Sequence, residues 1–273
     1  MAVDCISYAD AYSGGKSAEH EGLPPEINIL LSLGIGITAT KVAGKYLLKD
    51  AKGAVLGEIH DHPAGGEGKS NFAKNIDAIL AKQGITLDEF NSLRLRDVTT
   101  LNKNEKATLK AIRESIPMPD SNTEMQKAIP SSDIEKYLNG TYTQVGGYVA
   151  RAADVAQLKT YDDIFDSLCL GYPGSEFKPI RDDSIGVIRF TTGESSRLSI
   201  PYGKEMGGTE VAQQPFTGNG FTKAINGQII PEFKSNGYLD VADGAQLVEI
   251  HKNGTETVRA VYSKIDKKFI PIN

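Results

Sequence analysis

The chain changes character at Pro117-Met118-Pro119, and this change limits the folds that it can adopt. Residues 71–116 carry charged, well-capped helical patterns. Beyond them, eight of the eleven tyrosines lie at or after Tyr137, and seven of the nine phenylalanines lie at or after Phe165. Aromatic residues favour strands, and the two prolines are typical of a connection between elements. The sequence therefore predicts an α+β protein, in which a helical N-terminal region is followed by a compact, mostly β C-terminal domain.

Composition divides the chain into three stretches. Residues 1–60 are rich in glycine, alanine and other apolar residues. Within them, the pattern of residues 27–48 predicts a helical hairpin that packs on a neighbour or inserts late. Because two lysines interrupt this pattern, we expect no stable membrane span. Residues 61–120 form a helical linker region, and residues 121–273 are the α+β domain in which we expect the chemistry.

Capping signals and periodicity predict the individual elements. Thr86 with Glu89 is a capping box for one helix, and Gly84 suits the end of the helix before it. A third helix is expected to end before Pro117. Two more helices carry the capping boxes Ser132–Glu135 and Thr160–Asp163. Strands are expected at 142–150, 185–192, 196–201, 227–233, 245–251 and 256–263, with a hairpin at Asn253-Gly254 between the last two.

The stretch "HDHPAGGEGKS", from His60 to Ser70, approaches two known motifs and completes neither. It ends like a phosphate-binding loop, but Pro63 stands at the first glycine position and has no N–H to donate. Its two histidines, His60 and His62, have the spacing of a His-x-His-x7-Ser-x-x-Asp zinc site. Ala73 replaces the aspartate that would be the third protein ligand. We therefore expect no metal and no catalysis by these histidines.

Composition also excludes several function classes. The net charge of −5 argues against a broad nucleic-acid-binding surface. Two cysteines specify no disulfide or zinc framework, and the start of the chain lacks the pattern of a signal peptide. Beyond residue 123, His251 falls in an alternating strand and Cys169 has no histidine near it in sequence. Neither a Cys–His hydrolase nor a histidine-pair RNase is expected, so carboxylates, lysines, arginines, hydroxyls and amides must carry any chemistry.

The most distinctive block runs from Pro201 to Gly237. It is rich in glycine and side-chain amides, and a long irregular block of this kind is typical of a binding loop. A meandering connection between sheets remains the alternative. Glu232 follows the apolar run Ile229-Ile230-Pro231, at the end of an expected strand, where a carboxylate must either pair or take part in chemistry.

The order of these patterns resembles that of ADP-ribosyltransferase toxins. That family has a strand with a basic residue, a helix, a middle strand, a later strand of the form L-x-I-P-x-G, and a loop that delivers a catalytic glutamate. In this chain "MQKAIP", "SSDIEKYLNG", "VGGYVARAADV", "RLSIPYG" and "GQIIPEF" stand in those places, over roughly residues 123–252. The resemblance implies an ADP-ribosyltransferase-like fold for the C-terminal domain, NAD as the substrate and no metal. It makes Glu232 the catalytic residue.

The same resemblance implies the substrate contacts. The arginine that the family carries on its first strand is absent, which leaves Lys127 or, less directly, Arg151 and Arg189 to bind the pyrophosphate. An aromatic residue, Tyr148 or Phe221, is expected to stack on the nicotinamide. Ile230 stands two residues before the glutamate, so the family's rule for choosing the acceptor does not apply.

The whole layout resembles the C-terminal part of a bacterial polymorphic toxin of the Rhs or contact-dependent-inhibition kind. That resemblance implies a pre-toxin segment, a linker and a toxin domain that is secreted or delivered into a target cell in interbacterial competition. It also implies a cognate immunity protein and a macromolecular target that the sequence does not identify. Two alternatives stay open. One is a metal-independent RNase toxin that uses Arg189, Thr191 and Glu232, and the other is a non-enzymatic binding or structural module.

Overall fold

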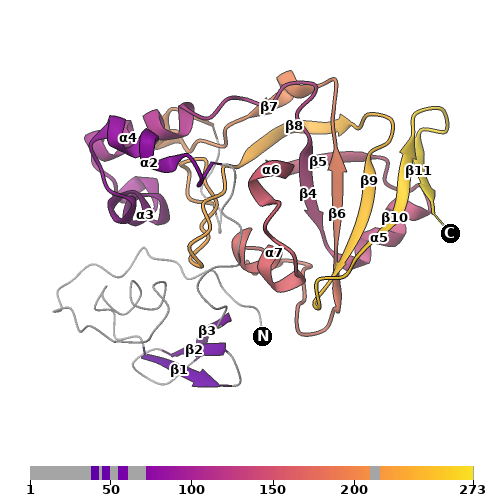
Figure 1. Cartoon of the computed structure of the whole chain (residues 1–273), viewed down its shortest axis with the longest axis horizontal. Coiled ribbons are helices and arrows are strands. Elements are labelled where there is room, and N and C mark those ends of the chain that lie inside the picture. The colour runs from indigo at the N-terminus through magenta and orange to yellow at the C-terminus, as the bar shows by residue number, and fades with distance from the viewer. Residues whose placement is uncertain (1–37, 43–44, 50–54, 61–71, 210–215, 273) are drawn as a thin grey trace.

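The computed structural model describes residues 38–42, 45–49, 55–60, 72–209 and 216–272 (Figure 1). For the first three of these ranges it describes the backbone alone. The stretch between His60 and Phe72, which includes His62, lies outside the described residues. The absence of catalysis by the two histidines therefore stays a prediction.

The first described elements are three strands rather than helices. Strands β1 (Thr38–Val42), β2 (Lys45–Lys49) and β3 (Val55–His60) form an antiparallel sheet in that order. The helical hairpin expected over residues 27–48 is therefore wrong from residue 38 onward. β-Branched residues, which are stiff at χ1 and favour strands, recur at alternate positions of β1 and outweigh the partly helical spacing of the apolar residues.

The helices expected after residue 71 are confirmed. They are α2 (Ile76–Gln83), α3 (Leu87–Leu95) and α4 (Lys103–Glu114), with the short 3₁₀ helix η2 (Val98–Thr100) before the last. Gly84 ends α2 with a left-handed φ of 68°, and the Thr86–Glu89 capping box begins α3. Each of these local signals acts within one turn of helix, which is why the sequence alone was sufficient to find them.

An eight-stranded antiparallel sheet forms the C-terminal part, in the order β11-β10-β9-β6-β4-β5-β8-β7 (Figure 1). Its strands are β4 (Met125–Ile129), β5 (Gln144–Arg151), β6 (Ser184–Phe190), β7 (Leu198–Ser199), β8 (Phe233–Asp240), β9 (Gln246–His251), β10 (Glu256–Ser263) and β11 (Lys268–Pro271). The helices between them are α5 (Ser131–Leu138), α6 (Ala152–Val155) and α7 (Tyr161–Ser167), with 3₁₀ turns η3 (Ser195–Arg197) and η4 (Lys204–Met206). The expected α+β class is confirmed.

Two local predictions for this part are confirmed and two are wrong. The Thr160–Asp163 capping box begins α7, and Gly254, with φ of 84°, lies in the hairpin between β9 and β10. Helix α5 instead begins two residues early, at Ser131 with Pro130 in the N-cap position, so that Ser132 lies inside the helix and not at its cap. The run 227–233 is not a strand before Phe233, because its backbone pairs with residues 220–222 through an isolated bridge and not with a strand of the sheet.

Helices cover both faces of the sheet. Along β6, Ile188 and Phe190 share one cluster of buried residues with α5, whereas Ile185 and Val187 share another with α6 and α7. This alternation is the period of two that a strand buried on both faces requires. The sheet core of the C-terminal part is therefore closed on both sides.

A third cluster joins the helical region to the C-terminal part. Buried residues of α2, α3 and α4 pack with Tyr202, Met206, Phe221 and Ile229 of the long block before β8. The prolines near residue 118 thus separate the helices from the strands in sequence, but the helical region and the C-terminal part share this hydrophobic cluster. The three-part division of the chain stays a prediction.

Candidate functional site

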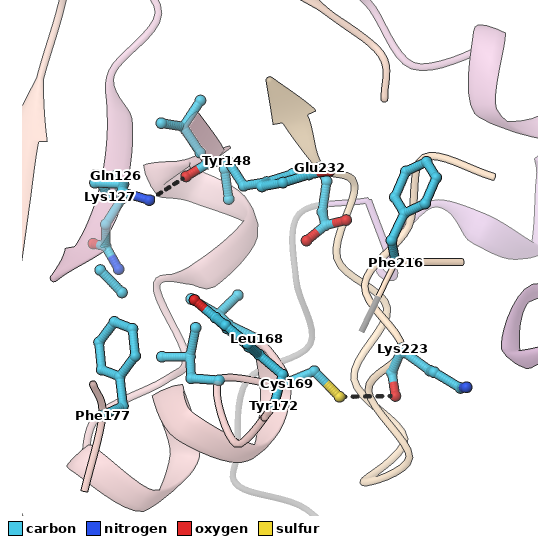
Figure 2. Close-up of a pocket in the computed structure, with 14 residues that line it drawn as sticks. Gln126, Lys127, Tyr148, Leu168, Cys169, Tyr172, Phe177, Phe216, Lys223 and Glu232 are labelled. Carbon is cyan, nitrogen blue, oxygen red and sulfur yellow. Dashed lines mark hydrogen bonds between the residues drawn. The ribbon is translucent and has the colours of Figure 1, made fainter. Parts of the chain in front are cut away.

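A cavity of about 240 Å³ opens where β4 and β5 meet the loop after α7 and the segment that leads into β8 (Figure 2). This volume lies below the range for most ligand sites in proteins, which measure roughly 300–1,000 Å³. Its walls combine charged groups with aromatic rings. Apolar rings bury the surface of a ligand, and charged groups fix its orientation and give specificity. The cavity is therefore suited to one end of a larger ligand or to a small one.

Glu232 places its carboxylate in this cavity (Figure 2). It directly precedes β8, and its backbone N–H donates to the carbonyl of Gly220 over 2.9 Å. Burial raises the pKa of the carboxyl to about 7, while the positive charges of Arg113 and Lys127 act in the opposite direction. A carboxyl with a pKa near 7 can exist in either protonation state under ordinary conditions, and perturbed groups of this kind concentrate at functional sites.

Lys127 faces the same cavity from β4, a central strand of the sheet. Its Nζ donates to the carbonyl oxygen of Tyr148 over 3.1 Å (Figure 2). Burial lowers the pKa of its ammonium group to about 8, and the negative charges of Glu232 and Asp133 partly oppose this shift. The amine is thus a half-buried, partly desolvated cation that is available to an anionic group of a ligand.

A bulge in β5 gives Lys127 its acceptor. The register of β5 against β8 shifts between Gly146 and Tyr148, and Gly147 adopts a φ of 80°. The N–H of Gly147 donates to Ser235 Oγ over 2.9 Å, which holds the bulge in place. Bulges re-aim neighbouring groups and are frequent beside active sites. Here the bulge turns the Tyr148 carbonyl toward the lysine.

Aromatic rings line the cavity from three elements. Tyr148 comes from β5 and is 37% exposed, Tyr172 and Phe177 follow α7, and Phe216 precedes β8. The Nζ of Lys234 lies 5.5 Å from the centre of the Tyr148 ring, a cation–π contact that restrains the tyrosine. Flat rings beside a cation suit a planar heterocycle that carries a phosphate.

Lys223 adds a second cation to the wall of the cavity. Burial lowers the pKa of its ammonium group. Cys169 also lines the cavity and is 2% exposed, and its Sγ lies 3.6 Å from the carbonyl oxygen of Lys223. The cysteine is thus a buried part of the cavity wall.

Three of the six residues expected from the sequence meet in this cavity: Lys127, Tyr148 and Glu232. The two arginines are engaged elsewhere. Arg151 pairs with the buried Asp154 at 2.6 Å, and Arg189 pairs with Glu256 at 2.9 Å while it donates to Gln126. Neither arginine lines the cavity. Lys127 is therefore the one of the three proposed pyrophosphate contacts that the cavity can use directly.

The expectation for Phe221 is wrong. Its ring is fully buried and packs against Phe72 and Phe90, with ring centres 5.8 and 5.4 Å away. It therefore belongs to the core that joins the helical region to the C-terminal part and cannot stack on a ligand. Phe216, five positions earlier in the same block, is the phenylalanine that lines the cavity.

The described residues contain no group of three or more His, Cys, Asp or Glu side chains placed to hold a metal ion. Within the same residues, no helix combines the length and the apolar character needed to cross a membrane. Comparison of the chain with protein-family models, with curated proteins and with solved structures returned no match. The cavity and the order of the elements that build it are therefore the features that bear on function.

Proposed function

We propose that the cavity binds NAD and cleaves the bond between nicotinamide and ribose. The observation that carries this proposal is the meeting of Glu232, Lys127 and several aromatic residues in one cavity. A carboxylate, a cation and flat rings are the groups that a ribose, a pyrophosphate and a nicotinamide require. The products are nicotinamide and either free ADP-ribose or ADP-ribose joined to a macromolecule.

The order of elements supports the resemblance to ADP-ribosyltransferase toxins. A strand with a basic residue (β4), a helix (α5), a middle strand (β5) and a later strand (β7) follow one another in the chain. Glu232 then comes directly before β8, which lies between β5 and β7 in the sheet. An ADP-ribosyltransferase-like fold for residues 121–273 is part of the proposal.

In the proposed reaction, the C–N bond breaks and its electron pair leaves with nicotinamide, whose ring nitrogen becomes neutral. Positive charge then develops at C1 of the ribose. The ionised carboxylate of Glu232 stabilises this charge, an electrostatic effect that the burial of the carboxyl group strengthens. Lys127 holds the pyrophosphate, Tyr148 and Phe216 hold the nicotinamide ring, and water or a protein side chain attacks C1 and loses a proton.

A toxin role follows from the layout resemblance and is part of the proposal. In it, the protein is secreted or delivered into a target cell, acts on NAD there, and is neutralised by a cognate immunity protein. The RNase alternative grouped Arg189 and Thr191 with Glu232, but the guanidinium of Arg189 is held by Glu256 and Gln126 and does not line the cavity. This geometry favours the NAD proposal.

The test is to incubate the purified protein with NAD and to measure nicotinamide release. Retention of label from NAD carrying a labelled adenine on protein or nucleic acid distinguishes transfer from hydrolysis. Parallel incubation with tRNA and rRNA tests the RNase alternative. Nicotinamide release that disappears in Glu232→Gln supports the proposal. Cleaved RNA with intact NAD supports the RNase, and an inert protein supports the binding module.

A further inference from the structure

Arg113 connects the helical region to the site from inside the core. It lies on α4 and is fully buried. Its Nε donates to the carbonyl of Gly220 over 2.9 Å, and its Nη2 donates to the carbonyl of Glu232 over 2.6 Å. Since the N–H of Glu232 also donates to Gly220, one guanidinium closes both ends of the segment that leads to the proposed catalytic carboxylate.

The surroundings leave this guanidinium little freedom. Its central carbon lies 4.5 Å from the centre of the Phe233 ring and 5.8 Å from that of Phe221. Gly220 has a φ of 83°, and a Cβ at this position would come within 2.9 Å of Arg113 Nε and 2.6 Å of Ile200. Any other residue would therefore push the arginine from its acceptors. The planar guanidinium lies near two rings and donates to two carbonyls, and the ammonium group of a lysine cannot reproduce this geometry.

We propose that Arg113 is a positioning residue of the site, which fixes the backbone at Glu232 and thereby holds the carboxylate in the cavity. The arginine touches no ligand and acts through the glutamate. This inference rests on the proposed function for its effect on turnover, but the contact itself can be tested without NAD. The charge of Arg113 also stabilises the ionised form of Glu232, because it opposes the rise in the pKa of that carboxyl.

The chain offers a matched control in Arg94. This arginine is also on a helix of the same region, α3, and is also buried. It donates to backbone carbonyls of the same irregular segment, at Thr222 and Ala224, but makes no contact with Glu232. A change at Arg94 therefore disturbs the packing between helices and segment without touching the glutamate.

The first experiment uses the unaltered protein. Side-chain Nε–Hε signals of arginine are followed by NMR from pH 5 to 9, together with the carboxyl carbon of Glu232. The Arg113 signal is expected to move with the midpoint of Glu232, the Arg94 signal is expected to stay still, and the Arg113 response should vanish in Glu232→Gln. If Glu232 titrates while the Arg113 signal does not follow, the proposal is overturned.

The second experiment compares Arg113→Met with Arg94→Met. In Arg113→Met, the midpoint of Glu232 should rise because a positive charge is lost, and kcat for NAD cleavage should fall on the order of a hundredfold with KM little changed. Arg94→Met should leave the midpoint in place. Equal effects of both variants would make Arg113 merely structural. If Arg113→Met does not fold, the NMR titration of the unaltered protein tests the proposal. If NAD is not the substrate, the titration midpoints of Glu232 in the two variants still test whether Arg113 acts on Glu232.

Discussion

Lys127 in β4 and Glu232, directly before β8, face one cavity, and each stabilises the charged form of the other. Burial works against both charges. The result is a carboxyl with a pKa of about 7 beside an amine with a pKa of about 8. Two groups that interact in this way titrate as a pair. The ionised pair, which the proposed reaction needs, is most populated between these two values.

The first prediction concerns the charge of Glu232. Glu232→Gln keeps the shape of the side chain but removes the negative charge that, in the proposed reaction, stabilises the developing cation. We expect nicotinamide release to fall by on the order of a hundredfold or more. The control is Glu256→Gln, which removes a carboxylate of the same sheet that pairs with Arg189 outside the cavity. It should keep full activity, at a cost of about 1 kcal/mol or less in stability. Full activity in Glu232→Gln would contradict the assignment.

The stability of Glu232→Gln should depend on pH in a specific direction. The pKa of this carboxyl rises from its ordinary value of 4.5 to about 7 on folding, so the folded state binds the proton more tightly than the unfolded state. The contribution of Glu232 to stability is therefore complete below pH 4.5 and is lost as the pH rises through 7. At pH 8 the glutamine variant should be more stable than the parent, by on the order of 1 kcal/mol. Thermal unfolding at pH 5 and pH 8 checks this, and a variant that is less stable at pH 8 would contradict the burial of the charge.

The activity itself should have a bell-shaped dependence on pH. The acid limb reports ionisation of Glu232 and the alkaline limb reports loss of the proton from Lys127, with apparent values near 7 and 8 that belong to the pair. Lys127→Arg should remove the alkaline limb, because a guanidinium keeps its proton throughout this range. Lys127→Met should move the acid limb upward, because Glu232 loses a stabilising positive charge. An alkaline limb that persists in Lys127→Arg would assign that limb to another group.

Phe216 and Phe221 should respond to truncation in opposite ways. Phe216 lines the cavity, so Phe216→Ala should raise KM for NAD about tenfold, the equivalent of roughly 1 kcal/mol or more of stacking, and should leave unfolding almost unchanged. Phe221 is fully buried among other rings, so Phe221→Ala should cost about 3–5 kcal/mol in stability. Urea unfolding and initial-rate kinetics on both variants measure the contrast. The reverse pattern would mean that the wrong ring had been assigned to the cavity.

Much of the local structure could be predicted because its causes are local. The Thr86–Glu89 capping box, the stop at Gly84 and the hairpin at Gly254 each depend on residues within one turn. The prediction for the first described strands is wrong because the cause of these strands is not local. Apolar residues at mixed spacing in residues 27–48 fit a helix or a strand, and the pairing of β1 with β2 decided between them.

The site was found only in part, because much of it comes from irregular segments. Glu232 and Lys127 could be named from the order of elements, and the block Pro201–Gly237 was recognised as unusual. Nothing in that block distinguishes Phe216, which faces the cavity, from Phe221, which faces the core. Arg113 reads as one polar residue of an amphipathic helix, and its acceptors are backbone carbonyls 107 and 119 positions away. Contacts to distant backbone leave no pattern in a sequence.

The last prediction concerns the helical region. Its composition differs from that of the C-terminal domain, but the two regions pack together. Helices α2, α3 and α4 cover Tyr202, Met206, Phe221 and Ile229, and their buried arginines satisfy carbonyls of the same segment.

A protein that begins at residue 121 would expose those side chains and leave these carbonyls without their donors, each at a cost of about 1–3 kcal/mol when no water replaces it. We expect its sheet to form while residues 202–209 and 216–232 lose order and NAD cleavage is lost. Amide exchange should show protection in β6 and β9 but fast exchange near Glu232. A protein that begins at residue 72 keeps the helices and serves as the control. Equal protection of this segment in both proteins would establish that residues 121–273 fold alone, as their composition suggests.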